Sequence, residues 1–352
     1  MEGKYYFSVV VVAVMLGLSG IARPASTKPI TVAELALYNG TDRQQILEEG
    51  AKKEGALLFY TTGILTQAVR PVVEAFQKKY PYIKVDIWRG ETNNLVSRIF
   101  EEHKSGRSFS DVIEVTQTGE IVLEEGGILQ PYFSPNLNQI EEGTIKNASG
   151  GGAFSAGHYQ SGIGLGYNTK RITKAQVPKT YQDFLDPKWK GKVALVSGNT
   201  GVSWLGTVFE TQGEQFVEKL AKQNFSVHTV SAMALLDMII NGEYDFAPTI
   251  MDSHVINAKK RGAPVEWVPI EPTPMYVGQI MLPKQTLHPY AALLFIDFDL
   301  SKQAGEIYKA NGYVSPRKDI AGERTYKKDY GPQSSKQVEN WNKVFNKYFL
   351  QK

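Results

Sequence analysis

Apolar and polar residues alternate along the first part of the chain in a regular order. Short apolar runs typical of buried strands are separated by segments with apolar residues at helical spacing. The predicted strands are 56–62, 83–90 and 111–116. The predicted helices are 31–55, 65–81, 93–106 and 119–127. Strands that alternate with helices predict a parallel sheet with helical crossovers.

The second part repeats this order after a change in composition. Residues 143–157 are rich in Gly, Ala and Ser, which is typical of a loop, and 158–169 is predicted to be extended. A second α/β block runs from 193–201 to a strand at 245–250 by way of two helices. The further elements expected are a strand at 272–284 and helices at 289–301 and 334–350. Two such blocks predict two lobes joined by crossing strands, with a cleft between them.

The N-terminus has the layout of a secretory signal peptide. Lys4 precedes an apolar run at 7–18, and small residues follow at 19–25. The run is shorter than the roughly 20 apolar residues that cross a bilayer as a helix. We expect cleavage after Ala22 or Ala25 and export, and an uncleaved anchor is the alternative.

Composition narrows the class of protein further. The chain of 352 residues contains no cysteine, so we expect no disulfide and no lipid-modified cysteine. Its stability then depends on a large core, and free diffusion in a periplasm is favoured. The formal net charge is +3; residues 1–25 hold two cations and one anion, which leaves +2. A near-neutral chain gives no support for a nucleic-acid partner or a membrane-surface role.

Several segments resemble the extracellular solute-binding proteins of the ferric-ion-binding type. They are AKKEGALLFYTT, VRPVVEAFQKKYP, SDVIEVT, GIGLGYNT, DPKWKGKVAL, NGEYDFAPT, KKRGAPVEWV and NGYVSPRKDI. The resemblance covers most of the chain from Ala51 to about Ile320, and DPKWKGKVAL is its most specific part. It implies an α/β, type II periplasmic binding fold, in which two lobes are joined by hinge strands around a ligand cleft. It also implies a monomer without a cofactor that delivers a small-molecule ligand to an ABC permease in the inner membrane.

The resemblance also sets the expected organisation of the chain. Residues 1–25 are assigned to the signal peptide and 161–274 to the second lobe. The first lobe is expected to be discontinuous, from 26–160 and 275–320. Residues 321–352 are assigned to a C-terminal helical tail.

The metal-binding members of that family carry two adjacent tyrosines after the strand that here is 245–250. In this chain the pair falls at Asp252 and Ser253, with His254 next. Phenolate oxygens suit ferric iron, so their absence argues against direct ferric binding. The alternative is iron held by Glu91, Asp252 and His254 together with a bound anion.

The candidate ligand-binding residues lie where predicted strands end. In the first lobe they are Thr61, Thr62, Arg89, Glu91, Thr116 and Gln117. In the second lobe they are Ser197, Gly198, Asn199, Thr200, Ser231, Asp252, Ser253 and His254. Trp204 and Tyr276 complete the set. Ligands of open α/β sheets bind beyond the carboxyl ends of strands, near helix N-termini.

Four of these candidates have a second interpretation. SGNTG (197–201) follows a strand and opens a helix, as an anion-binding loop does, and it matches the anion-contacting loop of the family; an ordinary helix cap is the alternative. Arg89 either makes a bidentate contact with a carboxylate or phosphonate or pairs with Glu91. Trp204 either covers the pocket or packs in the core. Tyr276 is either a hinge-side contact or simple packing.

No set of catalytic residues is recognisable. GIGLGYN has the wrong spacing for a dinucleotide loop, and the glycines at 150–152 lack the Lys-Ser/Thr of a phosphate-binding loop. Neither an HExxH pair nor a GxSxG elbow is present. We therefore expect a periplasmic protein that captures a small anionic or oxygen-rich solute by lobe closure, and not an enzyme. The alternatives are an exported enzyme on the same scaffold and a sensor domain.

Overall fold

The computed structural model describes residues 1, 31–107, 109–320, 322 and 326–350. The predicted signal peptide lies outside these ranges, apart from its first residue. None of the helices within them combines the length and the apolar character that a membrane span requires.

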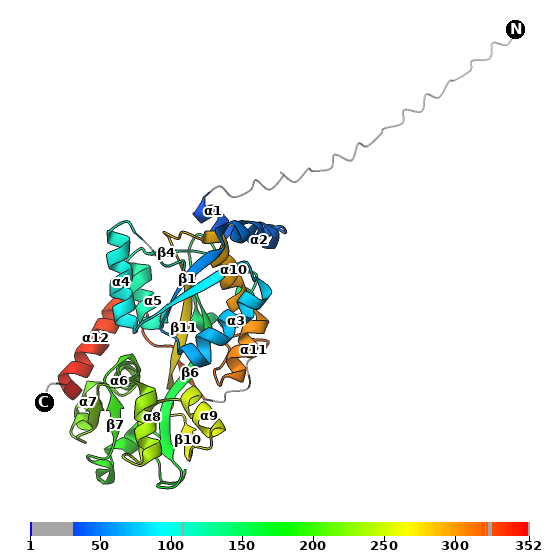
Figure 1. Cartoon of the computed structure of the whole chain (residues 1–352). Coiled ribbons are helices and arrows are strands. Elements are labelled where there is room, and N and C mark those ends of the chain that lie inside the picture. Colours follow the sequence, from blue (N-terminus) through cyan, green and yellow to red (C-terminus); the bar gives the residue numbers. More distant parts are fainter. Residues whose placement is uncertain (2–30, 108, 321, 323–325, 351–352) are drawn as a thin grey trace.

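The first lobe contains three parallel strands with helices around them (Figure 1). The strands are β1 (Ala56–Thr61), β2 (Lys84–Arg89) and β3 (Val112–Thr116), and β1 lies between the other two. The helices are α1 (Val32–Leu37), α2 (Arg43–Glu54), α3 (Arg70–Lys79), α4 (Thr92–Lys104), α5 (Gln117–Glu125), α10 (Pro289–Asp299) and α11 (Lys302–Ala310). Short strands β4 (Leu129–Gln130) and β5 (Ile145–Asn147) extend the sheet.

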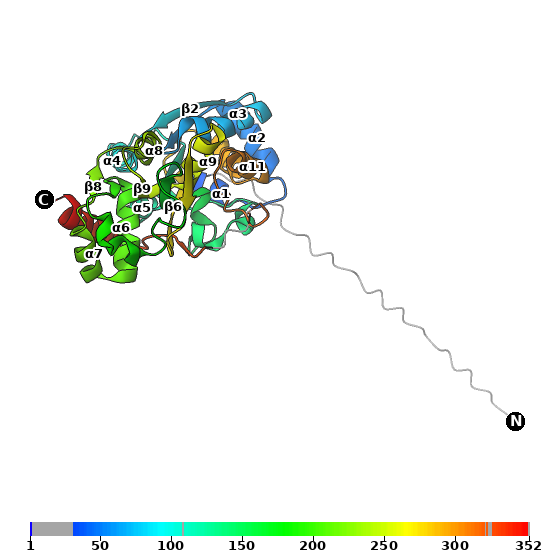
Figure 2. The same cartoon turned by 90° about the horizontal axis from the view of Figure 1, so that it is seen from below.

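The second lobe holds the remaining helices (Figures 1 and 2). They are α6 (Asn199–Gln212), α7 (Glu214–Ala221), α8 (Ala232–Asn241), α9 (Asp252–Lys260) and α12 (Ser335–Phe345). Its strands are β7 (Ala194–Val196), β8 (Ser226–His228), β9 (Phe246–Met251) and β10 (Val265–Val268). Single 3₁₀ or π turns occur in both lobes at Leu65–Val69, Leu137–Gln139, Glu142–Thr144, Tyr181–Leu185, Pro187–Trp189 and Asn346–Leu350.

Two long strands run between the lobes. β6 (Ala153–Asn168) pairs antiparallel with β11 (Thr273–Pro283) in its first half and with β9 and β10 in its second half. β11 also pairs with β3 of the first lobe. The short strand β12 (Lys328–Asp329) lies beside the start of β11 and leads toward α12. These crossings form a ten-stranded sheet that belongs to both lobes.

The local sequence explains why these elements begin and end where they do. α2 ends at Gly55, whose φ of 70° is a left-handed conformation that glycine adopts without a steric penalty. α3 has a proline in its first turn, where the missing N–H costs nothing. The side chains of Val72, Val73 and Phe76 are buried on one face of α3, as their spacing predicts.

Apolar side chains gather in separate clusters in the two lobes. One cluster joins α2, α3 and α10 of the first lobe around Phe76 and Phe295. Another joins α6 and α12 of the second lobe around Trp204 and Trp341. The end of the chain therefore packs into the core of the second lobe. The predicted boundaries near 160 and 274 fall within or next to β6 and β11, and the residue limits of the lobes stay a prediction.

Most predicted elements are confirmed, but the single helix predicted at 31–55 is two helices, α1 and α2, separated by the non-helical residues 38–42. The predicted loop at 143–157 is also wrong in part. Residues 145–147 form β5, and β6 begins at Ala153. The small residues there are buried because strands approach closely: a Cβ on Gly157 would lie 2.8 Å from the Cβ of Thr144. Small side chains therefore indicate tight packing in β6, whereas only the turn at 148–152 is a loop.

The second block is also richer than predicted. Three helices and β8 lie between β7 and β9, whereas the sequence predicts two helices. α7 and α8 are short segments separated by the strand residues 226–228. Such short apolar runs do not distinguish a strand from a helix by their periodicity alone.

Candidate functional site

A cavity of about 540 Å³ lies between the two lobes. Its size is within the range of about 300–1,000 Å³ typical of small-molecule sites. The first lobe and the crossing strands contribute Thr62, Ile64, Arg89, Glu91, Thr92, Thr116, Tyr159, Tyr276 and Tyr313. The second lobe contributes Val196, Ser197, Gly198, Asn199, Thr200, Thr229, Val230, Ser231, Ala232, Met233, Met251 and His254.

The first-lobe wall is built from the carboxyl ends of the parallel strands. Thr61 of β1 is paired with Arg89 of β2 and with Glu114 of β3, so the three strands end at the same edge of the sheet. α4 begins after β2 and α5 begins directly after β3. Because all three strands are parallel, the loops and helix N-termini that follow them collect at the cavity.

The second-lobe wall is formed by two adjoining loops. β7 and β8 are parallel, and the backbone N–H of Ser197 donates to the carbonyl of His228 at 2.9 Å. The hydroxyl of Ser197 lies 3.3 Å from that of Thr229. These contacts hold the N-termini of α6 and α8 beside each other on the cavity wall.

The glycine that ends the SGNTG segment is required by the tight turn into α6. A Cβ on Gly201 would lie 1.8 Å from the backbone carbonyl oxygen of Val196. No side chain fits at that distance without moving the backbone. The close return of the chain keeps the first residues of α6 against the end of β7.

The start of α9 lies behind the second-lobe wall. The hydroxyl of Ser161 on β6 lies 2.5 Å from Asp252 Oδ1 and 2.8 Å from the Ser253 hydroxyl. The next residue, His254, is 4% exposed and lines the cavity, and neither ring nitrogen has a hydrogen-bond partner among the described residues. Burial lowers the pKa of the His254 imidazole to about 4. The ring is therefore neutral at pH 7.

Eleven of the sixteen candidate residues line this cavity. They are Thr62, Arg89, Glu91, Thr116, Ser197, Gly198, Asn199, Thr200, Ser231, His254 and Tyr276. Thr61 is buried, and its hydroxyl bonds to Glu114. Asp252 and Ser253 are held by Ser161 away from the wall. Trp204 is fully buried against Tyr181 and Phe184, which is the packing alternative considered for it.

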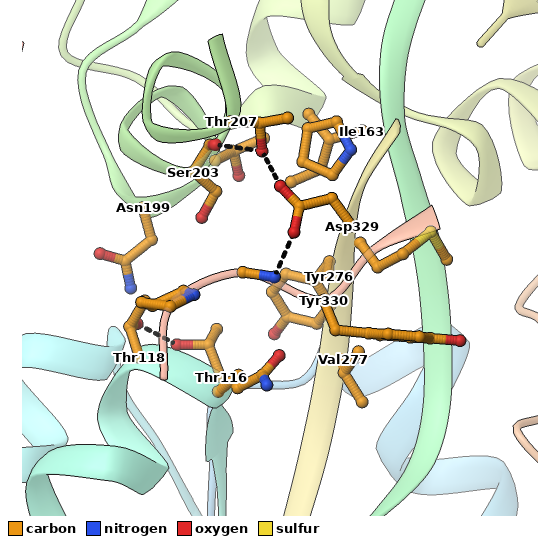
Figure 3. Close-up of a pocket in the computed structure, with 16 residues that line it drawn as sticks. Thr116, Thr118, Ile163, Asn199, Ser203, Thr207, Tyr276, Val277, Asp329 and Tyr330 are labelled. Atoms are coloured by element: carbon orange, nitrogen blue, oxygen red, sulfur yellow. Dashed lines mark hydrogen bonds between the residues drawn. The ribbon is translucent and has the colours of Figure 1, made fainter. Parts of the chain in front are cut away.

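Gln117 lies in a small crevice that adjoins the cavity and shares Thr116 and Tyr276 with it. Figure 3 shows this crevice, in which Asp329 extends between Thr207 on α6 and the start of β11. Asp329 accepts a hydrogen bond from the Thr207 hydroxyl at 2.6 Å and one from the backbone N–H of Gly331 at 3.0 Å. The volume of the crevice, about 20 Å³, is enough for about one water molecule. The crevice is too small for a solute, and the larger cavity is the candidate site.

Arg89 and Glu91 form an ion pair at the cavity rim, with 2.8 Å between their charged atoms. Both side chains are well exposed, at 40% and 71%. Such a pair contributes little to stability because water screens it. Arg89 can therefore exchange Glu91 for a ligand anion at small cost.

Three important residues of the wall are missing from the sequence-based set. Tyr159 and Tyr313 line the cavity, and Glu114 lies directly behind it. Tyr159 and Glu114 lie inside strands that the apolar pattern predicts as simple core. A carboxylate within the apolar run of 111–116 is the one signal that singles out Glu114.

The predicted iron-binding set does not form one site. Asp252 is bonded to Ser161, Glu91 is paired with Arg89 at the rim, and His254 stands alone. Across the described ranges no three His, Cys, Asp or Glu side chains are grouped closely enough to hold a metal ion.

Protonation of His254 is expected to destabilise the protein in acid. Its folded pKa, about 4, lies below the ordinary value of 6.5, so the unfolded chain binds the proton more tightly. This histidine therefore makes stability rise with pH between about 4 and 6.5, by about 3 kcal/mol in total at 1.36 kcal/mol per pKa unit. The free energy of unfolding, measured by chemical denaturation at several pH values in this range, should rise less steeply with pH for His254→Gln than for the wild type.

The matched control for this prediction is His103→Gln, on α4 outside the cavity. For this control, the change of the free energy of unfolding with pH is expected to equal that of the wild type. A His254→Gln protein with the full wild-type slope would contradict the prediction.

Comparisons with known proteins agree with this architecture. A model of the bacterial extracellular solute-binding protein family matches residues 122–345. An uncharacterized protein of Haemophilus influenzae is 27% identical over 269 residues, which are 73% of this chain and 76% of that protein. Iron-bound HitA from Pseudomonas aeruginosa is 21% identical, covers 83% of this chain and 97% of its own, and has a TM-score of 0.70.

A second solved structure is AfuA from Actinobacillus pleuropneumoniae with fructose-6-phosphate bound. It is 22% identical, covers 85% of this chain and 100% of its own, and has a TM-score of 0.71. Two α/β lobes, two crossing strands and an interlobe cavity define a type II periplasmic binding fold, as expected from the sequence. The chain belongs to the family of bacterial extracellular solute-binding proteins.

Proposed function

We propose that this protein captures a small solute with an anionic group in the interlobe cavity and delivers it to the permease of an ABC importer. The observation that carries this proposal is the convergence of helix N-termini on one cavity. The residues before α4, α5 and α6 make no capping hydrogen bond with their side chains. Residues at these three helix starts line the cavity.

The unused backbone donors at these helix starts favour an anion. The first N–H groups of a helix have no partner inside it, and each N-terminus carries roughly half a positive charge. α4 and α5 belong to the first lobe, whereas α6 belongs to the second. An anion between them is attracted by both lobes and stabilises the closed arrangement.

The hinge for this closure is supplied by the crossing segments. β6 and β11 continue from one lobe to the other, and closure requires only small changes along them. We infer that both walls of the cavity contact the bound ligand, and that the ligand is released to the permease chemically unchanged. In this proposal the protein works as a monomer in the periplasm and catalyses no reaction.

Two of the similar structures hold different ligands, iron in HitA and exogenous fructose-6-phosphate in AfuA. The fold therefore does not decide the ligand, and the site must. The helix starts and the hydroxyl-rich segments 197–200 and 229–231 match an oxyanion better than a bare cation. The tyrosines of the wall point the same way, because burial raises the pKa of both Tyr159 and Tyr276. Ferric iron binds phenolates, and the raised pKa makes removing these protons costlier than at an exposed tyrosine.

Removing a single backbone donor from α6 is expected to weaken anion binding about 10-fold or more. Asn199→Pro removes the N–H of the first helical residue, where proline is well tolerated. Gly198 before it is extended, as a residue before proline should be. Asn199→Ala also removes the side chain but keeps the N–H, and is the control. A hydrogen bond to a charged group contributes about 1.5–3 kcal/mol, so the two variants should differ clearly.

The measurement is thermal unfolding of the periplasmic protein with inorganic phosphate, propyl phosphate, acetate, fructose 6-phosphate, ferric chloride and ferric citrate. A ligand present at about 100 times its Kd stabilises the fold by roughly 2.7 kcal/mol. We expect such a shift from an iron-free anion, and its loss in Asn199→Pro alone. A shift with ferric iron and with no iron-free anion would overturn the proposal. The bound ligand should be recovered chemically unchanged.

A further inference from the structure

A buried carboxylate lies directly behind the first-lobe wall of the cavity. Glu114, near the end of β3, is fully buried. Its two oxygens accept hydrogen bonds from the hydroxyls of Thr61, Thr62 and Tyr159 and from the backbone N–H groups of Thr62 and Gly63. No salt bridge to Glu114 is found among the described residues. All five groups around Glu114 act as hydrogen-bond donors. This is the environment of an ionised carboxylate, which accepts hydrogen bonds and donates none.

Glu114 determines which way the hydroxyl protons of the wall point. Thr62 Oγ1 lies 3.1 Å from Glu114 Oε1, and the Tyr159 hydroxyl also lies 3.1 Å from it. Both must donate to the carboxylate. Thr62 Oγ1 is also 3.2 Å from the hydroxyl of Tyr276. Since the Thr62 proton is used on Glu114, Tyr276 donates to Thr62.

The cavity therefore meets only oxygen lone pairs from these three hydroxyls. Thr62, Tyr159 and Tyr276 all line it. A hydroxyl whose proton is engaged elsewhere presents an acceptor. The part of the wall formed by Thr62, Tyr159 and Tyr276 requires a hydrogen-bond donor from the ligand. The helix starts at the cavity require an acceptor.

Charge and ring geometry add a preference for a cation at the acceptor wall. The charge of Glu114 is separated from the cavity by one hydroxyl. The ring centre of Tyr159 lies 6.2 Å from that of Tyr276 and 4.7 Å from that of Tyr313, so three aromatic rings gather in this region. Cations are attracted to aromatic rings and to a buried carboxylate, whereas a neutral hydroxyl gains only the hydrogen bond.

We propose that the ligand is a small zwitterion, with an oxyanion at the helix starts of the second lobe and an ammonium group at Thr62, Tyr159 and Tyr276. This inference rests on the proposed function and specifies its ligand class. The contacts to the anionic end of the ligand can also be made by many other anions. The ammonium end selects among them, because a methyl group at that place leaves the acceptors without a donor.

The test uses phosphate esters that match in size and differ at one end. O-phosphoethanolamine, 2-hydroxyethyl phosphate and propyl phosphate end in an ammonium, a hydroxyl and a methyl group. Their affinities for the full periplasmic protein are measured by titration calorimetry, together with inorganic phosphate. The comparison is repeated with longer esters of matched size, 4-aminobutyl, 4-hydroxybutyl and pentyl phosphate.

In at least one of the two lengths, we expect the ammonium ester to bind 10-fold or more tightly than the methyl ester, with the hydroxyl ester between them. Equal affinities in both lengths, or tightest binding of the hydroxyl ester, would overturn the zwitterion inference. The proposed function would survive that result as long as one of the anions binds. If no anion binds, inorganic phosphate included, both fail.

Two tyrosine variants locate the preference on the wall. Tyr276→Phe removes a hydroxyl connected to Glu114 through Thr62, whereas Tyr82→Phe removes one outside the cavity that has no hydrogen-bond partner among the described residues. Both variants keep an aromatic ring, so neither opens a cavity. Tyr276→Phe should weaken binding of the ammonium ester at least 5-fold and leave the methyl ester unchanged. An equal loss for both esters, or an equal effect of Tyr82→Phe, would count against the inference.

Discussion

Replacing Arg43 with methionine is expected to lower the free energy of unfolding at pH 7 by about 3–5 kcal/mol. Arg43 is buried at the start of α2 and forms an ion pair of 3.1 Å with Asp297 on α10. Its guanidinium also donates to the carbonyls of Tyr38 and Phe133. The variant would leave the Asp297 charge buried without a partner, and this cost is larger than that of losing a surface contact.

The pH dependence of the Arg43→Met variant provides a second check. Burial raises the pKa of Asp297 to about 6, although Arg43 lowers it. A raised folded pKa means that ionised Asp297 destabilises the fold as the pH rises above its ordinary value of 3.8. Without Arg43 the folded pKa is higher still, so the loss of stability should be smaller at pH 5 than at pH 7.

Chemical unfolding at both pH values measures these effects. Arg171→Met removes an exposed pair with Asp245 and serves as the control, with an expected change of about 0.5 kcal/mol or less. Adding Asp297→Asn to Arg43→Met should restore much of the lost stability. A loss below about 1 kcal/mol for Arg43→Met at pH 7 would show that water reaches Asp297.

Replacing Trp341 with alanine should cost a similar 3–5 kcal/mol, the range for truncating a buried large aromatic side chain. Trp341 attaches α12 to α6 of the second lobe and is 2% exposed. Its indole N–H donates to Glu210 at 2.9 Å. A Cβ on Gly206 would lie 2.0 Å from the indole, so the ring rests directly on the α6 backbone.

Two measurements report the loss of the Trp341 contact with α6. The free energy of unfolding should fall, and protease should cut within 335–350 more readily, because α12 loses its largest apolar contact. Asn342→Ala changes an exposed residue on the same helix and should stay within about 0.5 kcal/mol. Wild-type protease resistance in Trp341→Ala would mean that the other contacts of α12 are sufficient.

The candidate site could be predicted from the sequence where it follows strand ends. Ser197 to Thr200 come directly after a short apolar run and Arg89 ends a strand of alternating residues. The parallel arrangement brings such strand ends together. Trp204 shows the limit of this reasoning, since helical spacing does not tell which face of α6 meets the core. Tyr159 was missed because it lies within the long strand β6, where only the crossing between lobes brings its hydroxyl to a cavity.

By itself the sequence determined the alternation of strands and helices, the two-lobed class and the strand-end segments that line the cavity. These features depend on local periodicity and on turn residues such as Gly55. Both are signals carried by residues that lie close together in the sequence. Only the tertiary structure decided that small residues of 153–157 are strand, that α12 packs on the second lobe, and that Glu114 orients three hydroxyls. Each of these depends on contacts between residues far apart in the chain, where burial and hydrogen-bond direction are set by the partner and not by the local sequence.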